Sequence, residues 1–157
     1  MTAVSLIASD NHLVAKKCRI GHQHVHDRNV VNDMTDKAFE QKLARYPLRV
    51  QAVARKTRAL VLSALPKVEE TIDPSAPVVG YSYGPGYKGL ICTLILSQAG
   101  TKLGLTDSAA LPDPLKLLRG SGKKHRYVPI TTAADLRKPG LRELLEAADA
   151  RRRDRNR

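Results

Sequence analysis

The chain has 157 residues, and its 27 lysines and arginines against 15 aspartates and glutamates give a formal net charge of +12. Two cysteines are too few for a disulfide framework, and the longest apolar stretch, residues 90–96, is far shorter than the roughly 20 residues that cross a bilayer. These features exclude a disulfide-stabilised scaffold and a bilayer-spanning helix. They predict one cytoplasmic domain with no membrane partner.

The first 33 residues show no sustained helical or strand period, and we interpret residues 1–33 as a disordered N-terminal extension. This segment contains the alternating histidines His22, His24 and His26. An extended chain would place their imidazoles on one side, as a transition metal prefers, but the low local order argues against a specific metal site. We therefore predict no metal in this protein.

Helical signals begin at Thr35 or Asp36, either of which can cap a short helix that ends near Pro47. A second helix is predicted from about Leu48 to Leu65, because apolar residues recur there at the spacing of one helix face. A third, short helix is predicted over Pro66 to Ile72, since proline is tolerated in a first turn.

The next segment contains short runs of valine, isoleucine, leucine and threonine between glycine-rich turns, which is typical of β-hairpins. The predicted strands are Val78–Tyr83, Leu90–Ser97, Lys102–Leu105 and Tyr127–Ile130. Turns this short join only antiparallel strands. Thr132 and Asp135 form a shortened capping box, and Pro139 opens a last helix with an apolar stripe.

The resulting order of elements predicts an α+β fold with two layers. We expect an antiparallel sheet of about four to five strands, packed with N-terminal and C-terminal helices, in a single domain over residues 34–149. Residues 150–157, which include five arginines, are predicted to be a basic disordered tail.

The basic loop, residues 119–126, is the leading candidate site, because it has four basic residues and no acidic residue. Crowded like charges repel one another, so an anion that neutralises them gains Coulomb energy and charge-assisted hydrogen bonds. The two loop glycines can expose backbone N–H groups to the same ligand. The predicted ligand-binding residues are Arg119, Gly120, Gly122, Lys123, Lys124, Arg126 and Tyr127.

Other chemistry has weaker support in the sequence. The string Gly122-Lys123-Lys124 resembles part of a phosphate-binding P-loop, but Lys124 stands where a serine or threonine should hold magnesium. No pairing of nucleophile and base with a known spacing occurs, and Cys92 lies mid-strand in an apolar run, as a buried inert thiol does. We therefore predict no enzyme activity and no cofactor.

Residues 48 to about 149 contain the string LVLSALPKVEETI and, later, the string LPDPLKLLRGSGKKHRYVPITTAADLRKPGLRELLEAA. On these features, which are its most specific ones, the segment resembles the bacterial YdhG-like family. The resemblance implies a small α+β domain with an antiparallel sheet. Some relatives are described as frataxin-like iron chaperones. Iron delivery would need the acidic residues Glu69, Glu70 and Asp73, together with Asp36 and Glu40.

Charge decides between the functions considered. From Met34 onward the chain has 23 basic and 12 acidic residues, a net charge of +11, whereas a surface that gathers ferrous iron should be acidic. We therefore favour a non-catalytic binding module that takes an anionic ligand or partner on its basic patch. Metal delivery is one alternative. Nucleic-acid binding is the other, although no helix-turn-helix, zinc finger or RNA-binding aromatic platform is legible in the sequence.

Overall fold

The computed structural model describes residues 30–155 and residue 157. The chain divides into two units, Met1–Ala38 and Phe39–Arg157. In the first unit residues 30–38 are helical, and in the second residues 39–43 are helical. The expectation that residues 30–33 are disordered and that the helix begins at Thr35 is therefore wrong. His22, His24 and His26 lie outside the described residues.

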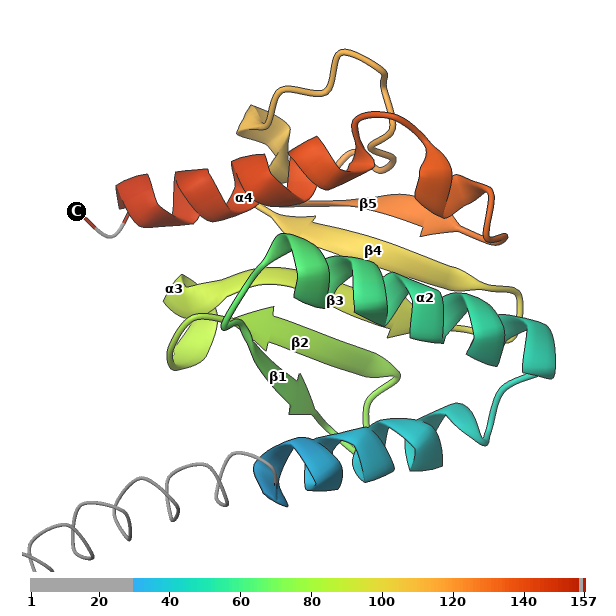
Figure 1. Ribbon diagram of the computed structural model, residues 1–157. Helices are drawn as coiled ribbons and strands as arrows, with labels where there is room; N and C mark the ends of the chain where they lie inside the picture. The colour runs from blue at the N-terminus through green and yellow to red at the C-terminus, as the bar shows by residue number, and fades with distance from the viewer. Residues whose placement is uncertain (1–29, 156) are drawn as a thin grey trace, which may run out of the picture. The chain divides into compact units, whose positions relative to one another are not determined.

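The second unit is built on a five-stranded antiparallel sheet with the strand order β1-β2-β3-β4-β5 (Figure 1). The strands are β1 Glu69–Ile72, β2 Val78–Ser82, β3 Leu90–Leu96, β4 Thr101–Thr106 and β5 His125–Ile130. Each strand pairs with the next along the chain. Short connections account for the first three pairings, whereas residues 107–124 separate β4 from β5. The predicted α+β class with an antiparallel sheet is confirmed.

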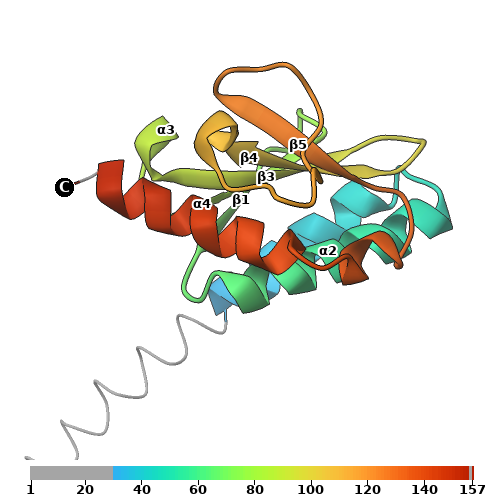
Figure 2. The ribbon, with the colours of Figure 1, turned by 90° about the horizontal axis from the view of Figure 1, so that it is seen from above.

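Two long helices, α2 Leu48–Ala64 and α4 Leu141–Arg155, lie on the same face of this sheet (Figure 2). Each buries a stripe of residues at helical spacing, including Val50, Val53, Ala54 and Val61 in α2 and Leu141, Leu144, Leu145 and Ala148 in α4. The helices and the sheet therefore form the two predicted layers. The shorter elements are α3 Gly86–Gly89 and the 3-10 turns η1 Ser108–Ala110 and η2 Asp135–Arg137.

The pairing register separates the two sheet faces, because directly opposed residues point to the same side. One row of paired residues, all apolar, belongs to the hydrophobic core: Ile72, Val79, Leu94, Leu103 and Val128. The neighbouring row points the other way and consists of Thr71, Gly80, Thr93, Gly104 and Tyr127. We call this side, opposite α2 and α4, the open face.

The predicted helix over Pro66–Ile72 is wrong, because residues 69–72 form strand β1. The strand brings Glu70 to the core side, where its carboxylate accepts hydrogen bonds from Arg58 and from the Tyr81 hydroxyl. Helix α2 ends at Ala64, and Lys67 adopts a left-handed backbone with φ 64°. The backbone therefore reverses where the sequence suggested a continuing helix.

The predicted disordered tail is wrong as far as Arg155, where helix α4 ends. Asp149 binds Arg152 and Arg153 within that helix, and Arg155 binds Asp107. These ion pairs extend the helix beyond its apolar stripe.

Strand β5 also begins two residues before its predicted start, at His125. No helix within residues 30–155 has both the length and the apolar character of a bilayer span.

Candidate anion-binding site

The basic loop has both ends fixed by backbone hydrogen bonds. The Arg119 N–H donates to the Tyr127 carbonyl at 2.7 Å, and the Tyr127 N–H donates to the Arg119 carbonyl at 3.0 Å. Within the loop, Arg126 Nε donates to the Gly122 carbonyl at 3.1 Å, and the Ser108 N–H donates to the Lys124 carbonyl at 3.3 Å. Backbone contacts therefore set the loop's shape, which leaves most of its basic side chains available.

Two glycines are required by this geometry. Gly120 has φ +100°, a conformation that other residues rarely adopt. Gly122 comes so close to the opposite side of the loop that a Cβ atom there would lie 2.3 Å from the carbonyl oxygen of His125. The predicted role of both glycines as exposed N–H donors stays a prediction. Their role in closing the loop follows from the geometry.

The loop places unneutralised positive charge at the surface. Arg119, Lys123 and Lys124 are exposed, and among the described residues none of the three has a carboxylate within ion-pair distance. Six acidic residues elsewhere in the described part of the chain have basic partners. These pairs are Glu40–Arg55, Glu70–Arg58, Asp107–Arg155, Asp135–Lys138, Glu146–Arg142, and Asp149 with both Arg152 and Arg153.

Lys102 and Tyr87 lie beside the loop, and with His125 of the loop itself they make three residues that are not among the seven predicted site residues. The Lys102 ammonium, on β4, lies 4.7 Å from the centroid of the Tyr127 ring. The Tyr87 hydroxyl lies 2.9 Å from His125 Nε2, and the two rings meet edge to face with centroids 5.5 Å apart. The only available signal was strand alternation, which places His125 and Tyr127 on one side of β5.

Of the seven predicted site residues, Arg126 contributes least to a binding surface. It pairs with Leu105, on the core side of β5, it is half-buried, and its side chain is bound to the Gly122 carbonyl. Arg119 and Tyr127 are opposed across an antiparallel bridge, so their side chains share the open face. Among the predicted residues, Arg126 therefore helps to close the loop, whereas Lys123 and Lys124 are exposed and available to a ligand.

The acidic residues that iron delivery would need are not brought together. Glu69 and Glu70 are neighbours on a strand, so they point to opposite faces of the sheet. Asp73 is turned toward Ser75, and Glu40 toward Arg55. In the part of the chain that the structure describes, no three histidine, cysteine or acidic side chains converge as a metal site.

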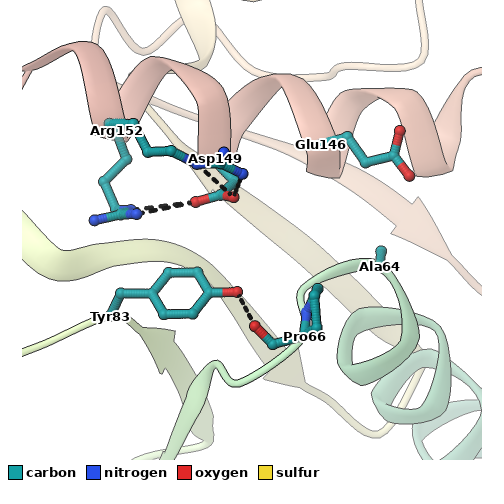
Figure 3. A pocket seen from close by; sticks show the side chains of 7 residues that line it. Ala64, Pro66, Tyr83, Glu146, Asp149 and Arg152 are labelled. Carbon is teal, nitrogen blue, oxygen red and sulfur yellow. Dashed lines mark hydrogen bonds and ion pairs between the residues drawn. The ribbon is translucent and has the colours of Figure 1, made fainter.

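A cavity of about 300 Å³ opens between α4, the end of α2 and the end of β2 (Figure 3). Its lining residues are Ala64, Pro66, Tyr83, Glu146, Asp149, Arg152 and Arg153. Asp149, only 8% exposed, accepts from both arginines, and the Arg152 guanidinium lies 4.8 Å from the Tyr83 ring centroid. The Tyr83 hydroxyl donates to the Pro66 carbonyl. The charged groups in this cavity largely satisfy one another, so it offers no excess charge to a ligand.

Burial alters the two side chains in the sheet that resemble reactive groups. Cys92 is fully buried, and burial raises the pKa of its thiol. Tyr81 is also fully buried, and burial, reinforced by the neighbouring Glu70 carboxylate, raises the pKa of its phenol. Neither group is ionised at neutral pH, and solvent reaches neither of them, so neither is a nucleophile or a base.

No protein-family model matches this chain, and no curated protein or solved structure is detectably similar to it. The YdhG-like resemblance therefore stays a prediction that depends on the residues quoted for it.

Proposed function

We propose that this protein is a non-catalytic binding module that takes an anionic ligand on the basic loop. The observation that carries the proposal is the exposed trio of Arg119, Lys123 and Lys124, which has no acidic partner among the described residues on a loop of fixed shape. Fixed cations favour binding because the loop loses little conformational freedom when the ligand arrives. A cytoplasmic location is part of this proposal.

The loop's construction supports this proposal over a solvated connection. A bridge joins the two ends of the loop, and Gly122 approaches a backbone oxygen so closely that a Cβ there would lie 2.3 Å from it. Both features hold like charges together against their mutual repulsion. An anion relieves that repulsion, and each charge-assisted hydrogen bond it forms contributes about 1.5–3 kcal/mol.

Inorganic tripolyphosphate is a suitable first probe, because it carries several negative charges and no base or peptide. Binding should raise the melting temperature, since a ligand that binds only the folded state stabilises it. Amide chemical shifts of residues 119–127 should move in the same titration. Stability and shifts that do not change at millimolar tripolyphosphate in low salt would refute the proposal.

A charge-matched variant distinguishes the loop from net charge. Lys123→Ala with Lys124→Ala removes two exposed cations from the loop, whereas Lys56→Ala with Arg151→Ala removes two exposed cations from helices α2 and α4. The first pair should lose most of the tripolyphosphate effect and the second pair should keep it. Equal losses would mean that overall charge, rather than the loop, attracts the anion.

A further inference from the structure

The end of the open face nearest the basic loop combines aromatic rings with cations. Tyr127 and His125 come from β5, Tyr87 from α3, and Lys102 from β4. We infer that this surface binds single-stranded nucleic acid, with bases stacked on the rings and phosphates held by the basic loop. This inference rests on the proposed function, to which it adds the class of ligand.

The register places these groups on one side of the sheet. Tyr127 is opposed to Arg119 on one side and to Gly104 on the other, so all three belong to one row of the open face. His125 is two residues away on the same strand, and its side chain therefore points the same way. The Cα atoms of residues two apart in a strand lie about 7 Å from each other, about twice the 3.4 Å rise per stacked base, so each ring can take its own base.

The rings are accessible to a ligand. Tyr87 is 45% exposed, His125 is exposed, and Tyr127 is half-buried beside Gly120. The edge-to-face contact of Tyr87 with His125 covers one face of one ring, which leaves ring faces for a base. Lys102 is exposed on its flexible stem and can move from the Tyr127 ring to a phosphate when a base stacks there.

In the strands that the structure describes, the row of paired residues that contains Tyr127 carries no acidic group that would oppose a polyanion. The row beyond Tyr127 continues through Gly104, Thr93, Gly80 and Thr71, none of which is charged. The acidic Glu69 lies on β1, four strand spacings from β5, or about 19 Å at about 4.8 Å per strand. Asp107 is closer, but it is bound by Arg155.

The chemistry of the surface favours single strands over other anions. A small anion or an inorganic polyphosphate uses the cations and leaves the rings without a role. A duplex keeps its bases within the stack and offers a flat face little except phosphates. Unpaired bases present π-faces, and each base stacked on an aromatic ring contributes enough that loss of the ring weakens binding about fivefold or more.

Fluorescence anisotropy with fluorescein-labelled twelve-residue oligodeoxythymidine tests this inference on the full chain. The ring variant is Tyr127→Leu with His125→Ala, its ring-conserving control is Tyr127→Phe, and the cation variant is Lys123→Ala with Lys124→Ala. We expect the ring variant to bind at least tenfold more weakly, while its affinity for inorganic polyphosphate and its salt dependence do not change. Tyr127→Phe should bind as the original chain does.

The cation variant should weaken both ligands and lower the slope of log affinity against log salt by about 1.4 if two phosphate contacts are lost. If the ring variant is poorly folded by its melting curve, Tyr87→Ala replaces it, because that side chain is 45% exposed. The inference would be overturned if the ring variant bound the oligonucleotide as tightly as the original chain does. It would also be overturned if a duplex bound as tightly as the single strand. In either case, polyphosphate binding would preserve the proposed function. Failure of both ligands to bind would overturn both.

Discussion

Replacement of Glu70 by glutamine should be among the most damaging single changes in this protein. The Glu70 side chain is 6% exposed, and its carboxylate accepts from Arg58 Nε at 2.8 Å, from Arg58 Nη2 at 2.7 Å and from the Tyr81 hydroxyl at 2.9 Å. Arg58 is itself 18% exposed and lies 4.7 Å over the Phe39 ring. This cluster joins helix α2 to strands β1 and β2.

The magnitude follows from the burial of the pair. Loss of one partner from a buried ion pair costs about 3–5 kcal/mol, whereas an exposed pair contributes about 0–1 kcal/mol. Glutamine has the shape of glutamate, so Glu70→Gln removes the charge and opens no cavity. A loss of about 3–5 kcal/mol is a large part of the total stability of a small protein, which is about 5–15 kcal/mol.

Urea unfolding followed by circular dichroism measures this difference. At a slope of about 2 kcal/mol/M, the midpoint should fall by about 2 M. Glu40→Gln is the matched control, because Glu40 also pairs with an arginine but is 50% exposed, and its midpoint should hardly move. A triple variant, Arg58→Met, Glu70→Met and Tyr81→Phe, should be more stable than Glu70→Gln, since it removes all three polar groups together.

Two results would refute this reasoning. A midpoint for Glu70→Gln that falls no further than that of Glu40→Gln would show that the cluster behaves as a surface ion pair. A triple variant less stable than Glu70→Gln would show that the loss comes from packing rather than from the buried charge.

Three further predictions concern other parts of the structure. Gly122→Ala should shift the amide resonances of the basic loop and weaken tripolyphosphate binding, because the added Cβ would lie 2.3 Å from the His125 carbonyl oxygen. An unaltered spectrum would contradict this geometry. Cys92 should react with iodoacetamide in urea but at least a hundredfold more slowly in the folded protein, because burial raises the pKa of its thiol and excludes the reagent. Peptide mass spectrometry measures both rates. Asp135→Ala should cost about 1 kcal/mol at pH 7, because its carboxylate accepts from the Thr131 and Thr132 N–H groups. The difference should shrink below about pH 4. The Lys138 ammonium, and then the Thr132 and Thr131 N–H groups, lower the pKa of Asp135 in the folded state. The stability that Asp135 contributes is therefore present above its unfolded-state pKa and is lost as pH falls through its folded-state pKa. A stability difference that did not depend on pH would exclude the charge of Asp135 as its cause.

The fold could be predicted largely because its long elements have strong local patterns. Helix α2 shows its buried stripe from Val50 to Val61 in the sequence, and the glycines around residues 84–89 mark the reversal between β2 and β3. Strand β1 has no such pattern, since two of its four residues are glutamates. Its stability comes from Arg58 and Tyr81, which lie 12 and 11 residues from Glu70 in sequence.

The candidate site could be predicted only in part, for a related reason. A cluster of basic residues between glycines is a local feature, so residues 119–126 were visible in the sequence. The ring contact between Tyr87 and His125 joins residues 38 positions apart, and it exists only because α3 is next to the start of β5. Lys102 reaches Tyr127 through the register of β4 and β5, which alternation alone does not fix.

The distribution of ion pairs explains why the positive charge of the chain matters in one place. Most of the acidic partners lie on or beside α2, α4 and η2, where the arginines and lysines they bind are also found. Arg119, Lys123 and Lys124 have no such partners among the described residues and lie within six residues of one another, so the loop concentrates positive potential that pairing reduces on α2 and α4. A surface of this kind speeds the approach of a polyanion, and salt screens that effect over about 10 Å at 0.1 M. Stacking of bases on the rings of the open face depends much less on salt than the phosphate contacts do. If the loop cations and the rings act on one ligand, raised salt should slow association, whereas the ring variant should mainly speed dissociation. Stopped-flow kinetics measures the association and dissociation rates separately.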